Sequence, residues 1–208
     1  QEIIYAYSSS NIPIILGVTV ADSEEADKGL HAVTILGYSI DKQKSSNLIS
    51  HGLEKVYVHD DRYGPFIRMV YNQGNFTIML DNVKDENSEN KHEIYTVETL
   101  ILGLYHKIRI PYIPIKNTCL ALCDNLRDFV DSIPDTKKDE INNFKRLISN
   151  IQWDISVKEN ADLKKELLTT KLKNKDQHLT KALPKYLWSA VAIVEDIKIF
   201  QLLFDATD

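Results

Sequence analysis

The chain is 208 residues long, which allows one large domain or two small ones. Hydrophobic residues make up 43% and charged residues 26% of it, and its net charge of −5 comes from 25 basic and 30 acidic side chains that form no basic stripe. These values are typical of a globular protein and argue against a nucleic-acid groove. No apolar run approaches the roughly 18 residues that cross a bilayer.

The first half of the chain reads as a helix followed by strands. A helix is expected over residues 1–9, and an apolar run that suits a strand buried on both faces follows at 12–20. Further strands are expected at 31–40, 55–61, 62–70, 76–80 and 94–113, with a polar, flexible hairpin tip at 81–93. Residues 1–13 have no signal-peptide pattern and look like the middle of a helix, so we expect a longer parent protein.

The second half mixes helices with strands. Helices are expected at 118–133, after Pro134 and at 161–172, and strands at 151–157 and on both sides of Glu195–Asp196. The tryptophans, Trp153 and Trp188, are expected in the core. The fold class is therefore α+β: a region built on an antiparallel sheet over residues 1–115, then a helical and β-hairpin region of unknown role over residues 116–208.

Two cysteines, Cys119 and Cys123, stand four residues apart and share one face of the expected helix. A zinc site would need a second pair of ligands, so we expect no metal and no cofactor. Few cysteines in a chain of this length indicate a reducing compartment, and we expect a cytoplasmic protein in which both thiols pack as small apolar side chains.

A histidine and an aspartate stand where two strands begin and end. Alternation places His31 on the same face as Val33 in the first strand, and Asp60 on the same face as Val58 in the second. If these strands are antiparallel neighbours, His31 and Asp60 meet at one edge of the sheet. Asp60 would then accept a hydrogen bond from Nδ1 of His31 and leave Nε2 as a base.

Other interpretations of the same residues stay open. His31 can be a structural residue, and the two aspartates at positions 60 and 61 can cap backbone N–H groups in a solvated turn. A metal site built from His59, Asp60 and Asp61 is disfavoured, because adjacent residues of a strand point to opposite faces.

The stretches "GLHAVTILGYSID" and "VYVHDDRYGPF" resemble the His and Asp strands of papain-like cysteine peptidases, especially the bacteriocin-processing (double-glycine leader) type. The matching positions are His31, Val33, Gly37 and Tyr38 in the first stretch and Asp60 and Gly64 in the second. Asp61 stands where that family usually has proline. The resemblance covers about residues 1–80 and implies that His31 shuttles a proton while Asp60 orients it.

The family's nucleophile is a cysteine upstream of the histidine, and this chain has no cysteine before His31. One explanation is a nucleophile on a part of the protein outside this chain, which then is inactive alone. A second is a non-enzymatic scaffold that binds a peptide or protein partner. A third is a permuted papain-like acyltransferase or hydrolase, in which Asn117 or Thr118 caps a helix with Cys119 in its first turn. A fourth is a chance match within an unrelated α+β domain.

We expect the first of these: a papain-like cysteine peptidase or amidase domain that acts on a peptide or protein, binds no nucleic acid and does not span a membrane. The sequence does not indicate the oligomeric state.

Overall fold

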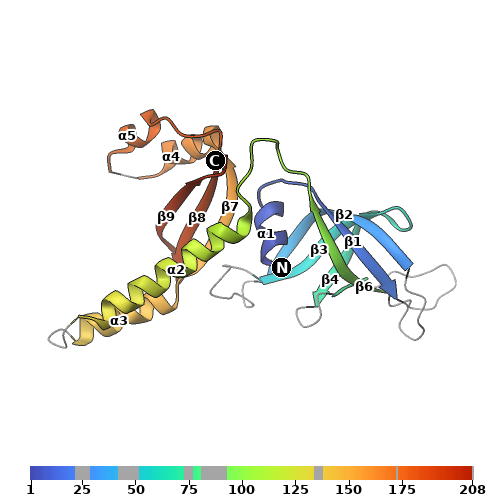
Figure 1. Ribbon diagram of the computed structural model, residues 1–208, viewed down its shortest axis with the longest axis horizontal. Coiled ribbons are helices and arrows are strands. Elements are labelled where there is room, and N and C mark those ends of the chain that lie inside the picture. The colour runs from blue at the N-terminus through green and yellow to red at the C-terminus, as the bar shows by residue number, and fades with distance from the viewer. Residues whose placement is uncertain are drawn as a thin grey trace. The chain divides into compact units, whose positions relative to one another are not determined.

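The computed structural model describes residues 1–21, 29–41, 52–72, 77–80, 93–133, 138–171 and 173–207 (Figure 1). They form two compact units, divided in the chain between Leu104 and Tyr105. Both units combine helices with antiparallel sheets, so the predicted α+β class is confirmed. The expected division after residue 115 falls inside the first helix of the second unit, because that helix begins at Tyr112.

The first unit contains a closed barrel of six strands in which all neighbouring strands are antiparallel. The strands follow one another around the barrel in chain order, and the last strand pairs with the first. All six strands expected from the sequence are present. Their bounds are β1 Ile14–Ala21, β2 Gly29–Asp41, β3 Gly52–Asp60, β4 Gly64–Asn72, β5 Thr77–Leu80 and β6 Ile94–Leu102.

Side chains that alternate along the strands fill the barrel. In β1, Ile14, Leu16 and Val18 are at most 1% exposed, whereas Ile15 is 40% exposed. This period of two is that of a strand with one buried face. The expectation that both faces of this strand are buried was wrong, because the barrel covers only its inner face.

Helix α1 (Glu2–Ser8) confirms the expected N-terminal helix and packs against β1 and β2. The ring of Tyr5 is buried and meets the ring of Tyr38 edge to face, with centroids 5.5 Å apart. The hydroxyls of Ser9 and Ser10 donate to the carbonyl of Ala6 at the end of the helix. The contact of Tyr5 with Tyr38 joins the helix to β2, the strand that carries His31.

The second unit is a three-stranded antiparallel sheet in the order β7–β8–β9, with helices α2 to α5. Trp153 and Trp188 are core residues, as expected, and the indole N–H of Trp188 donates to the carbonyl of Ile110 at 2.9 Å. None of the described helices is long and apolar enough to span a membrane. The bounds are α2 Tyr112–Asp131, α3 Lys138–Ser149, β7 Gln152–Glu159, α4 Asn160–Thr169, α5 Lys175–Thr180, β8 Tyr186–Val194 and β9 Ile197–Asp205.

The connection between β3 and β4 has a strained backbone. Asp60 pairs with Gly64 and Val58 with Ile67, so β4 carries one extra residue at this point. Phe66 lies in this bulge with a φ of 62°, a left-handed value that disfavours a bulky side chain. The side chain of Phe66 is 70% exposed, so little packing offsets the strain.

We expect Phe66→Gly to be more stable than Phe66→Ala by about 1 kcal/mol. Both variants lose the exposed ring, and only glycine accepts the positive φ without strain. Native-state hydrogen exchange of the β4 amides measures the free energy of opening of this part of the barrel. Equal values for the two variants would show that the backbone at this position is unstrained.

Candidate functional site

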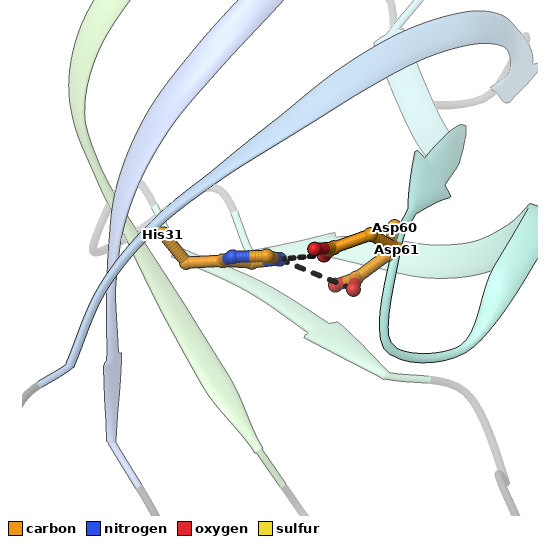
Figure 2. Close-up of side chains that lie close together, drawn as sticks. All are labelled: His31, Asp60 and Asp61. Carbon is orange, nitrogen blue, oxygen red and sulfur yellow. Dashed lines mark ion pairs between the residues drawn. The ribbon is translucent and has the colours of Figure 1, made fainter.

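His31 and Asp60 lie together at one end of the barrel (Figure 2). Strands β2 and β3 are antiparallel neighbours with Thr34 opposite His59, so the start of β2 meets the end of β3. Asp60 faces inward with its side chain 0% exposed, and the ring of His31 is 17% exposed. The predicted register is confirmed, and it brings the two predicted site residues together.

The imidazole of His31 faces two carboxylates through Nε2. This nitrogen lies 3.1 Å from Oδ1 of Asp60 and 3.4 Å from Oδ1 of Asp61. These distances allow an ion pair with either carboxylate when the ring carries a positive charge. The expectation that Nδ1 faces Asp60 was wrong, because Nε2 is the ring nitrogen farther from the backbone and reaches the end of β3.

Hydrogen bonds hold Asp60 as a carboxylate. Burial raises the pKa of its carboxyl, but the hydrogen bonds outweigh burial and leave that pKa below its ordinary value. Oδ1 accepts a 2.9 Å hydrogen bond from the backbone N–H of Arg62, and Oδ2 accepts one of 3.0 Å from the hydroxyl of Tyr95. The side chains of His31 and Arg62 lower the pKa further. Asp60 is therefore ionised at neutral pH.

Residues that the sequence analysis did not single out complete the site. Glu93, 9% exposed, accepts hydrogen bonds from Nη2 of Arg62 at 3.1 Å and from the hydroxyl of Tyr63 at 2.8 Å. Nη2 of Arg62 also donates to the hydroxyl oxygen of Tyr95 at 2.5 Å. These bonds join the β3–β4 turn to β6. We call the whole set the carboxylate cluster: His31, Asp60, Asp61, Arg62, Tyr63, Glu93 and Tyr95.

The sequence contained a weak signal for Tyr95 and none for Glu93. Alternation in "IYTVETLIL" makes Tyr95 an inward-facing aromatic residue with a polar tip that needs a partner when buried. Glu93 precedes this strand, in the segment expected to be a flexible hairpin tip. Residues 81–92 of that segment lie outside the described residues, but Glu93 itself is buried against the barrel end.

Both tyrosines of the carboxylate cluster donate hydrogen bonds at neutral pH. Burial, together with Glu93, raises the pKa of Tyr63 to about 12 and raises the pKa of Tyr95 far above its ordinary value. Each phenol therefore keeps its proton. The cluster holds three carboxylates and one arginine, so a positive charge on the ring of His31 is compensated within it.

Three side chains of the cluster are of the kinds that bind metal ions. Nε2 of His31 and carboxylate oxygens of Asp60 and Asp61 lie within 4.8 Å of one another. Nε of Arg62 is 3.5 Å from Oδ1 of Asp60, and its charge opposes a cation at that place. His59 has its side chain on the outer face of β3 and is exposed, so it is not part of this group. The arrangement suits an imidazole–carboxylate pair better than a metal site.

The cysteines lie in helix α2 of the second unit. Cys119 is 1% exposed, and burial followed by the neighbouring Cys123 raises the pKa of the Cys119 thiol to about 12. The expected cap at Asn117 or Thr118 was wrong, because the helix already begins at Tyr112. Cys119 therefore lies outside the first turn, and its surroundings disfavour the thiolate that a nucleophile needs.

Of the residues in the site, only His31 and Asp60 were predicted as partners. Comparison of the chain with protein-family models, with curated proteins and with solved structures gave no match. We therefore interpret the site from its own geometry.

We expect the free energy of unfolding of the barrel to depend less on pH in the acid range in Asp60→Asn than in the wild type. In the wild type, Asp60 contributes stability that is present above its ordinary pKa of 3.8 and is lost as the pH falls through its lower pKa in the folded state. The variant is less stable at neutral pH. Because its amide takes up no proton between about pH 6 and about pH 2, it does not lose this part of its stability as the pH falls. Urea titrations from about pH 6 to about pH 2, followed by the methyl NMR signals of Val58, measure the profile.

Asp61→Asn is the matched control, because the side chain of Asp61 is 81% exposed. Its acid profile is expected to follow that of the wild type. An Asp60→Asn profile as steep as the wild-type profile would mean that Asp60 is not a stabilising carboxylate.

Proposed function

We propose that the barrel is the histidine- and aspartate-bearing part of a papain-like cysteine peptidase or amidase. The observation that supports this most directly is the 3.1 Å approach of Nε2 of His31 to the buried carboxylate of Asp60. Both residues come from the two strands whose sequence resembles the His and Asp strands of that family. The pair lies at a barrel end, where the ring of His31 stays partly exposed.

In this proposal His31 moves the proton through Nδ1. Nε2 is turned to the carboxylates, so Nδ1 takes the proton from a cysteine thiol. The thiolate attacks the acyl carbon of a peptide or amide bond, and Nδ1 returns the proton to the amine that leaves. Water then hydrolyses the thioester and regenerates the thiol. Between these steps the ring is positive, and Asp60 and Asp61 compensate its charge.

We place the nucleophilic cysteine on a segment that precedes Gln1 in a longer parent protein. Cys119 does not suit the role, because burial holds its thiol protonated. By this proposal the 208-residue chain alone does not hydrolyse peptides. The substrate is a peptide or protein, and the unpaired Cys119 and Cys123 are compatible with a cytoplasmic location.

The proposal predicts that a thiol-reactive activity probe labels the parent protein in a way that depends on His31. We expect His31→Ala to slow labelling by at least about 100-fold, as for the loss of a general base. His59→Ala is the matched control, because His59 is an exposed histidine on the outer face of β3. Labelling is measured as a rate by intact-protein mass spectrometry.

Equal labelling rates for the wild type and His31→Ala would contradict a catalytic role of His31. A parent protein with no cysteine that the probe labels would contradict the peptidase assignment itself. The barrel would then be a scaffold that binds a peptide or protein partner.

A further inference from the structure

The buried carboxylate of Asp60 has two oxygens with different partners. Oδ1 faces Nε2 of His31 at 3.1 Å and the backbone N–H of Arg62 at 2.9 Å. Oδ2 accepts a hydrogen bond from the hydroxyl of Tyr95 at 3.0 Å. Among the described residues, Tyr95 provides the only hydrogen bond to Oδ2. Arg62 therefore holds the oxygen that faces His31, and the phenol of Tyr95 holds the other oxygen.

The hydroxyl of Tyr95 also lies 3.0 Å from Oε2 of Glu93, and one phenol has one proton to donate. Glu93 has other donors: Nη2 of Arg62 on Oε2 and the hydroxyl of Tyr63 on Oε1. Asp60 has no second donor for Oδ2 in the described part of the chain. Donation of the Tyr95 proton to Asp60 therefore leaves every carboxylate oxygen of the pair with a donor, whereas donation to Glu93 leaves Oδ2 of Asp60 without one.

Arg62 supports this use of the proton. Its Nη2 donates to the hydroxyl oxygen of Tyr95 at 2.5 Å and thus occupies a lone pair of the phenol. Nη2 also donates to Oε2 of Glu93, whereas the contact of Arg62 with Asp60 is made by Nε and falls on Oδ1. Glu93 therefore keeps a donor on Oε2 when Tyr95 donates to Oδ2 of Asp60.

We propose that Tyr95 is a positioning residue whose hydroxyl holds the carboxylate of Asp60 in the orientation that faces His31. Its importance for catalysis rests on the proposed function, whereas its action on Asp60 does not. Without the hydroxyl, Oδ2 is buried with no donor, which is costly for a charged oxygen. The carboxylate then turns toward another donor or takes up a proton, and either change weakens its contact with His31.

The charged and titratable groups that face Asp60 come from each element packed around it. They are His31 from β2, then Asp61, Arg62 and Tyr63 from the β3–β4 turn, Tyr95 from β6, and Glu93, which directly precedes β6. The ring of Tyr95 is itself 0% exposed and fills the barrel end. Tyr95→Phe keeps this ring and removes only the hydroxyl, so it separates positioning from packing.

The test is the titration of Asp60 in the chain as it stands. Aspartate labelled with carbon-13 at the carboxyl gives an NMR signal for each residue, and Asp60→Asn identifies the signal of Asp60. We expect its midpoint to rise by about one pH unit in Tyr95→Phe, the size expected for loss of a hydrogen bond to a charged oxygen. Tyr63→Phe is the matched control, because Tyr63 donates to Glu93 and not to Asp60.

An Asp60 midpoint in Tyr95→Phe equal to that of the wild type would overturn the proposal, as would an equal rise in Tyr63→Phe. In the parent protein, Tyr95→Phe is expected to slow probe labelling less than His31→Ala does. The acid limb of the labelling rate, plotted against pH, is expected to move to higher pH in Tyr95→Phe. If the Asp60 midpoint shifts in Tyr95→Phe but the labelling rate does not depend on His31, the peptidase proposal is refuted and the role of Tyr95 stands. Labelling that depends on His31 with an unshifted titration would refute the role of Tyr95 alone.

Discussion

The site depends on one buried charge, the carboxylate of Asp60. Its side chain is 0% exposed, and burying a carboxylate without partners is costly. The hydrogen bonds and charges around it offset this cost, and the pKa of Asp60 lies below its ordinary value in spite of burial. Its partners come from β2, from the β3–β4 turn and from β6. Closure of the barrel and assembly of the site are therefore one structural event.

The position of the site follows from the barrel's size. A barrel of six strands is narrow enough to be filled by side chains, and inward-facing positions along most of its length are apolar. Among the described residues, His31, Asp60 and Tyr95 bring polar groups together at one end of the barrel. A ring placed there is supported by buried groups and still partly exposed. That combination suits the proton transfer by His31 in the proposed function.

Much of this could be predicted from local sequence, because local patterns report which face of a strand a residue occupies. Alternation placed His31 and Asp60 on inward faces, and two antiparallel strands joined in sequence placed them at one end. Tyr95 and Glu93 escaped prediction because they reach the site from β6 and from the residue before it, which are distant in sequence from β2 and β3. No local sequence pattern predicts that β6 pairs with β1 and so closes the barrel.

Two further errors have physical causes. The run "IRIPYI" is apolar and reads equally as a strand or as the start of a helix, so the start of α2 at Tyr112 was missed. That error gave Cys119 a place in a first turn that it does not occupy. The prediction that Nδ1 of His31 faces Asp60 was also wrong. Strand register fixes the position of the histidine backbone but does not determine which ring nitrogen contacts the neighbouring strand.

Nε2 of His31 is turned to Asp60, and in the proposed function Nδ1 is left for the reacting proton. Nitrogen-15 NMR of the histidine rings tests it directly, because the two ring nitrogens give distinct signals according to which one carries the proton. For neutral His31 the account predicts a proton on Nε2 and an unprotonated Nδ1. A neutral ring with its proton on Nδ1 would contradict the account.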